Sequence, residues 1–95
     1  MFEFTPAVRM DEAAGTFQLA LLATESLHGA DRVTLEAVYK IDADNRVIEV
    51  DRTSVVGCTL ALVFLGYARR EFGQDAFRMR RVHGAAAAVT DGGDQ

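Results

Sequence analysis

The chain has 95 residues, a net charge of −4 and a single cysteine. An acidic chain repels phosphate backbones, so we expect no nucleic-acid partner. One cysteine forms no internal disulfide, and the N-terminal stretch has neither the basic nor the apolar region of a signal peptide. We therefore expect a cytoplasmic protein with one domain and no cofactor.

The first elements are a short strand and a helix. Apolar and polar residues alternate over 2–5, which is typical of a strand. The helix is expected over 11–27, because acids open it and Gly29 follows it. Its apolar stripe is formed by Ala13, Phe17, Ala20, Leu21 and Leu27.

A hairpin is expected over 32–51. Alternation over 33–42 indicates a half-buried strand. Its inward residues would be Val33, Leu35, Ala37, Tyr39 and Ile41. Residues 43–45 have the composition of a turn, and 47–51 would return as a second strand with Ile48 and Val50 inward.

Residues 53–68 carry no charge. A bilayer span needs about 20 apolar residues, so this segment is too short and we expect no membrane insertion. β-branched residues leave a strand as an alternative. Capping residues at 53–54, arginines at 69–70 and Gly73 favour a helix over 54–71.

A last strand is expected from Phe77 onward, where apolar residues alternate with arginines. The resulting order is β-α-β-β-α-β, which predicts an α+β ferredoxin-like domain. Its four-stranded antiparallel sheet would carry both helices on one face. The domain would cover 1–83, and 84–95 would form a flexible tail.

The second helix has more apolar surface than one sheet can cover. Val56, Leu60, Val63, Phe64 and Tyr67 suit the sheet side. The surplus predicts an association surface, and the alternative is that the first helix and the tail cover it. The candidate interface residues are Val55, Gly57, Cys58, Ala61, Leu62, Leu65 and Ala68.

A second candidate site is an anion site. We expect both helix N-termini at one end of the sheet, where free amides and arginines favour an anion. Its residues would be Arg9, Arg52, Thr53 and Ser54. Ordinary helix capping is the alternative.

Cys58 is the only candidate nucleophile. Its run GCTLALVFLGYARR resembles the central helix of the OsmC-like hydroperoxide reductases, but that family's second cysteine is absent. We do not adopt the assignment and expect an inert, buried thiol. His28 and His83 lack metal-ligand spacing, so we expect no catalytic or metal site.

The uncovered sheet face should be charged. It is expected to show Glu3, Thr5, Glu36, Lys40, Glu49, Arg78 and Arg80. No aromatic side chain interrupts them, so cross-strand ion pairs are expected in place of an RNA-binding face.

These observations favour a small non-enzymatic interaction or assembly module. It would self-associate, as a homodimer, or dock on a larger protein through the helix at 53–72. The alternatives are an anion-sensing regulatory domain and, with less support, a thiol peroxidase using Cys58.

We expect the small residues Gly57, Ala61 and Ala68 to let another helix approach, either the first helix or a helix of a second subunit. Ala61→Phe tests this packing. Overpacking a tight contact costs about 1–3 kcal/mol, whereas a solvated position tolerates the change within about 0.5 kcal/mol. Urea unfolding at two protein concentrations separates the outcomes. A concentration-independent loss indicates a contact within the chain, and a loss that shrinks on dilution indicates a contact between subunits. No loss would mean that the helix face is assigned wrongly.

Overall fold

The computed structural model describes residues 1–80, so the expected boundary at 83 and the expected tail over 84–95 lie outside the described residues. The elements in chain order are β1 (Phe2–Phe4), α1 (Met10–His28), α2 (Ala30–Glu36), β2 (Tyr39–Asp42), β3 (Val47–Val50), α3 (Val55–Phe72), a 3-10 turn (Gln74–Ala76) and β4 (Phe77–Met79).

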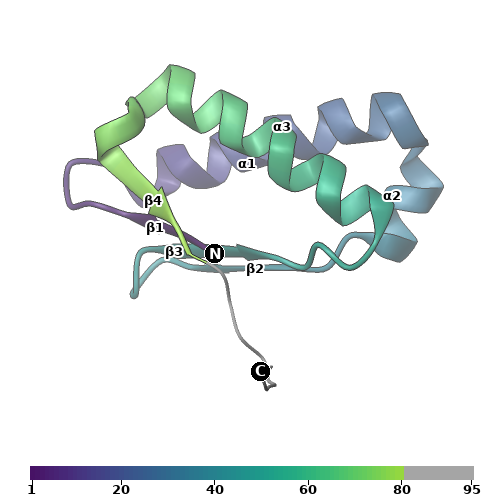
Figure 1. Ribbon diagram of the computed structural model, residues 1–95, viewed down its shortest axis with the longest axis horizontal. Helices are drawn as coiled ribbons and strands as arrows, with labels where there is room; N and C mark the ends of the chain where they lie inside the picture. The colour runs from purple at the N-terminus through teal and green to yellow at the C-terminus, as the bar shows by residue number, and fades with distance from the viewer. Residues whose placement is uncertain (81–95) are drawn as a thin grey trace, which may run out of the picture.

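The four strands form one antiparallel sheet in the order β2-β3-β1-β4. Figure 1 shows α1 and α3 side by side over one face of this sheet, with α2 at one end of the helical layer. The expected α+β class with an antiparallel four-stranded sheet is therefore confirmed. The helix α2 was not expected from the sequence.

Phenylalanine rings fill the space between the two layers. Phe64 of α3 packs edge-on against Phe2 of β1, with 4.8 Å between ring centroids. It also packs against Phe17 of α1 at 5.1 Å. Phe4 and Phe77, which are paired across β1 and β4, complete the cluster. One group of rings thus joins the sheet to both long helices.

The α1 helix agrees with the expected range to within one residue at each end. Its buried residues are Ala13, Thr16, Phe17, Ala20, Leu21 and Thr24. The Thr24 hydroxyl is satisfied inside the core because it donates to the Ala20 carbonyl at 2.7 Å. Leu27 was expected in the stripe, but it is 68% exposed, so that assignment was wrong.

The expected strand over 33–42 is wrong in its first half. Residues Ala30–Glu36 form α2, and only Tyr39–Asp42 are extended. Leu35 is 83% exposed, so the alternation of apolar residues does not mark a sheet face. Arg32 and Glu36 lie one helical turn apart and form a two-armed ion pair, which favours a helix.

The hairpin turn is held by Arg46. This residue has a positive φ of 60°, which is uncommon outside glycine. Its guanidinium donates to the backbone carbonyls of Phe4, Thr5 and Val8. The side chain therefore fastens the β2–β3 turn to the segment between β1 and α1.

The α3 helix confirms the expected helix over 54–71. The Ser54 hydroxyl caps its N-terminus, and Gly73 ends it with a φ of 88°. Val56, Leu60 and Phe64 are fully buried, as expected, whereas Val63 and Tyr67 are only half-buried.

The small residues of α3 pack within the chain. Gly57 lies directly against the backbone carbonyl of Asp51. Ala61 is buried and lines a small pocket together with Phe2 of β1. Ala68 is fully buried. The expectation that Gly57 and Ala61 approach another helix is therefore wrong, because a loop and the sheet occupy that side. For Ala61→Phe we now expect the concentration-independent loss.

Two glycines of α3 provide a matched pair of substitutions. A methyl group at Gly57 would collide with the Asp51 carbonyl oxygen, whereas one at Gly66 meets only open space. We expect Gly57→Ala to destabilise the fold by about 1–3 kcal/mol. Gly66→Ala should stabilise it by about 0.5–1 kcal/mol, because alanine is the better helix former. Urea unfolding of both variants measures the difference, and equal effects would contradict the close approach at Gly57.

Candidate interaction surface

The long helices α1 and α3 are antiparallel. They follow β1 and β3, which run in opposite directions, so the two helices begin at opposite ends of the sheet. At one end His28 Nε2 and Thr59 Oγ1 share a hydrogen bond of 2.8 Å. At the other end Glu12 and Arg70 line the same groove. The N-terminus of each helix therefore lies beside the C-terminus of the other.

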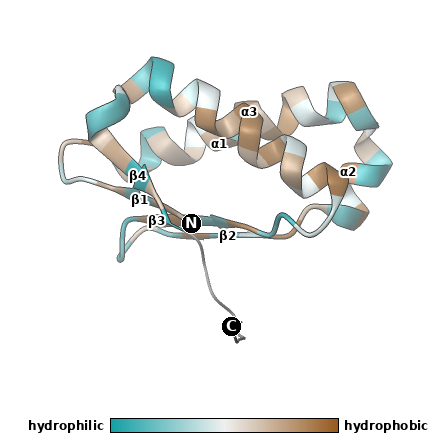
Figure 2. Ribbon diagram, viewed as in Figure 1, coloured by the Kyte–Doolittle hydropathy of each residue, from teal (hydrophilic) through white to brown (hydrophobic). Residues whose placement is uncertain are grey.

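The side of this helix pair that faces away from the sheet is apolar, and we term it the outer helical face. Figure 2 shows hydrophobic residues along both helices. The exposed fractions are 58% for Leu19, 59% for Leu22 and 70% for Leu62. Small residues lie between these leucines. The members of the face are Gly15, Leu19, Leu22, Ala23, Leu62 and Gly66. A contiguous apolar patch of this kind usually marks an association surface.

A groove of about 940 Å³ runs along this face between α1 and α3. Leu19 and Leu22 line it from α1, and the half-buried Tyr67 lines it from α3. Charged residues occur at one end only, where Glu12, Arg70 and Glu71 line the groove. None of these three side chains forms an ion pair within residues 1–80. The groove is thus apolar over most of its length and charged at one end.

The seven expected interface residues fall into three groups. Val55 and Leu62 are exposed and lie seven residues apart on one stripe of α3. Cys58 is exposed and Leu65 half-buried, and helical spacing places both on the flank away from α1. Gly57, Ala61 and Ala68 are buried.

The contribution of α1 to this surface was missed. Leu19 and Leu22 lie outside the predicted stripe of the first helix. Their helical spacing from Gly15 and Ala23 was the available signal. An apolar residue that lies outside the buried stripe of a helix faces either solvent or a partner.

The expected anion site is not assembled. Arg9 precedes α1, while Arg52, Thr53 and Ser54 precede α3, at the opposite end of the sheet. The expectation that both helix N-termini share one end was wrong because β1 and β3 are antiparallel. The Arg9 guanidinium instead holds the Asp11 carboxylate through two hydrogen bonds, of 2.8 and 3.2 Å.

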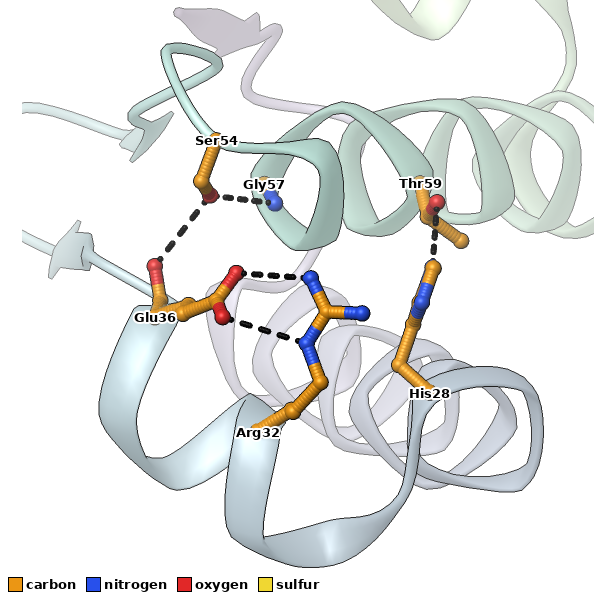
Figure 3. A network of polar contacts seen from close by, with 6 residues as sticks. All are labelled: His28, Arg32, Glu36, Ser54, Gly57 and Thr59. Carbon is orange, nitrogen blue, oxygen red and sulfur yellow. Dashed lines mark hydrogen bonds and ion pairs between the residues drawn. The ribbon is translucent and has the colours of Figure 1, made fainter.

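Ser54 is fully used by the fold, as Figure 3 shows. Its hydroxyl oxygen accepts from the Gly57 amide at 2.9 Å, and the hydroxyl donates to the Glu36 carbonyl at 3.3 Å. The Arg32 guanidinium donates twice to the Glu36 carboxylate at 3.1 Å, and this hydrogen bonding lowers the pKa of that carboxyl. Ser54 therefore caps α3 and fastens it to the end of α2.

Cys58 is exposed, so the expectation of a buried thiol was wrong. Its thiol donates to the Arg52 carbonyl at 3.1 Å, and within residues 1–80 no acidic or histidine side chain forms a hydrogen bond with it. Within residues 1–80 no three potential ligand side chains gather around a possible metal position. His83 lies outside that range. No helix of the described chain combines the length and the apolar character that a membrane crossing needs.

The uncovered face of the sheet carries the expected ion pairs. The Glu3 carboxylate accepts from Arg80 at 2.8 Å and from Arg78 at 3.4 Å. Lys40 and Glu49 lie opposite each other in the register of β2 and β3. Glu36 was expected on this face, but it belongs to α2. These cross-strand pairs leave the outer helical face as the more apolar of the two surfaces.

Comparison with known proteins places the chain in no family. No family model matches it, and neither the curated proteins nor the solved structures contain a significant match. The assignment of function therefore depends on the residues and their geometry alone.

Ser54→Ala tests whether the Ser54 hydroxyl caps α3 or binds an anion. Loss of the cap should lower the free energy of unfolding by about 1 kcal/mol. Thr53→Ala is the matched control, with an expected change within about 0.5 kcal/mol, because Thr53 is exposed and its side chain bonds to the carboxylate of Asp51, which is exposed as well. Added phosphate should leave the Tm of the wild type unchanged. A rise in the Tm of the wild type with phosphate, absent in Ser54→Ala, would show that Ser54 does bind an anion.

Proposed function

We propose that this protein is a non-enzymatic interaction module that associates, with itself or with a larger protein, through the outer helical face. The observation that carries the proposal is the exposure of Leu19, Leu22 and Leu62 on one side of the paired helices. Fully burying a leucine side chain is favourable by about 1.5–3 kcal/mol relative to leaving it in water. A partner that covers all three residues would therefore bind with a substantial hydrophobic contribution.

The composition of the face supports a protein partner over a small ligand. Glycine and alanine lie between the leucines, so the groove is shallow and long rather than enclosed. Small-molecule sites are usually concave, with a few convergent polar groups. Here the central part presents mainly apolar side chains, with Thr16 and Tyr67 as the residues that carry a hydroxyl group. An apolar helix or helix pair is the complementary shape.

We also propose the ferredoxin-like βαββαβ architecture, with α2 as an addition between α1 and β2. The strand order β2-β3-β1-β4 and the antiparallel direction of every neighbouring pair support this assignment. The fold alone does not define an activity, because one fold carries many functions.

A cytoplasmic location is part of the same proposal. Cys58 is an exposed thiol in a chain with no second cysteine. Such a thiol is compatible with a reducing compartment and would invite intermolecular disulfides in an oxidising one.

A double substitution, Leu22→Glu with Leu62→Glu, tests the outer helical face. Both residues are exposed, so the fold should tolerate carboxylates there, whereas a covering partner would not. We expect the wild type to bind an apolar dye and the double variant to lose at least most of that binding. Sedimentation should show concentration-dependent association of the wild type if the partner is a second copy.

Leu35→Glu is the matched control, because Leu35 is equally apolar and 83% exposed but lies on α2. It should leave dye binding and sedimentation unchanged. A wild type that stays monomeric at high concentration and binds no dye would rule out the proposed surface.

A further inference from the structure

We propose that the partner is a second copy of this chain, related by a two-fold axis that runs along α1 and α3 in the plane of the outer helical face. Each α1 would then lie on the α3 of the other subunit. This inference rests on the proposed function, because it uses the same face, and it adds the identity and orientation of the partner.

Symmetry limits the ways in which this face can meet itself. A two-fold axis brings the same patch of both subunits together. With the axis parallel to the helices, each position along the groove meets the same position in the partner subunit, and α1 meets α3. With the axis perpendicular to the helices, the order of positions along the groove is reversed, so that α1 meets α1 and each end of the groove meets the opposite end. The distribution of charge along the groove decides between these two arrangements.

The groove is charged at one end. There Glu12 lines it from the first turn of α1, and Arg70 and Glu71 line it from the last turn of α3. Charge at these positions also suits the two helix dipoles. Because the helices are antiparallel, the acidic end of one and the basic end of the other lie at the same level. Toward the other end the groove presents Ala23 and Ser26, which carry no charge.

With the axis parallel to the helices, opposite charges of the two subunits face each other. This arrangement sets Glu12 against Arg70 of the partner subunit, and the symmetry creates the same contact a second time. The leucines of the two faces meet between the charged and uncharged ends. An axis across the helices would instead lay each charged end on the Ala23 and Ser26 end of the partner. Charges covered without an opposite partner are costly.

The side chains remain available for such a contact. Within residues 1–80 the Glu12 carboxylate and the Arg70 guanidinium form no ion pair, although both line one groove. Asp11, the other acid in the first turn of α1, is already held by Arg9. Arg69 adds positive charge beside Arg70 and offsets Glu71. Arg69, Arg70 and Glu71 together give the last turn of α3 a net charge of +1. Within residues 1–80, each subunit thus presents the unpaired Glu12 on α1 and a net positive helix end on α3, with Glu71 as an acid beside Arg70 in the groove.

Charge reversal tests the arrangement. Glu12→Arg alone would set two arginines against each other at both symmetric contacts, and Arg70→Glu alone would do the same with two glutamates. We expect each single variant to raise the Kd of the dimer about tenfold in low salt, and less as salt screens the charges. The double variant Glu12→Arg with Arg70→Glu should return to the wild-type Kd.

Mixing the two single variants separates a contact between subunits from one within a subunit. In a mixed dimer both contacts pair opposite charges, so native mass spectrometry should show mostly heterodimer. A contact within one chain would gain nothing from mixing, and a statistical mixture of dimers would therefore overturn the inference. Single variants that dimerise like the wild type would overturn it as well. A monomeric wild type that still binds an apolar dye at the outer helical face would overturn this inference alone and leave the proposed function standing.

Discussion

The packing of Phe64 is the contact on which the other layers of the structure depend. Its ring is fully buried and touches Phe2 of the sheet and Phe17 of α1. A chain of this length has a total stability of about 5–10 kcal/mol. Truncating a buried phenylalanine costs about 3–5 kcal/mol, so this one residue accounts for a large share. With Phe64 in place, the rotation of α3 about its own axis is set, and so is the side of the helix that is left in water.

The apolar outer helical face follows from that rotation. Once Val56, Leu60 and Phe64 point into the core, helical periodicity leaves Leu62 on the opposite side. The same reasoning applies to α1. Because Phe17 points into the core, Leu19 lies on the opposite side of the helix. Each helix is therefore apolar on two sides, and only one of them is used by the fold. The uncovered face of the sheet carries the ion pairs of Glu3 with Arg78 and Arg80 and the charged residues Lys40 and Glu49, so the helices offer the more apolar surface for association.

The elements with two independent signals could be predicted from the sequence. The α3 helix had caps at both ends as well as a suitable length, and its expected range was confirmed. The segment at Val33 and Leu35 had only alternation as a signal, and it forms α2, in which Arg32 and Glu36 pair one turn apart and Val33 is buried. The anion site failed for a different reason. Its residues do lie at or just before the two helix N-termini, but the antiparallel sheet predicted from the element order already implies that these N-termini lie at opposite ends, and this consequence was not drawn. The buried position of Ala61 could not be predicted, because small residues suit a tight contact with a sheet and with a helix equally well.

Arg46 combines two requirements that usually fall on different residues. The backbone at this position has a left-handed conformation, which glycine adopts most readily. The three carbonyl groups that surround the side chain require a long donor with several hydrogens in a fixed plane, which only arginine supplies. Glycine would relax the turn and leave the carbonyls without a donor, and lysine would keep the charge but offer its hydrogens from a single nitrogen. Neither replacement meets both requirements, so a single side chain sets the conformation of the β2–β3 turn and at the same time joins it to the segment that leads into α1.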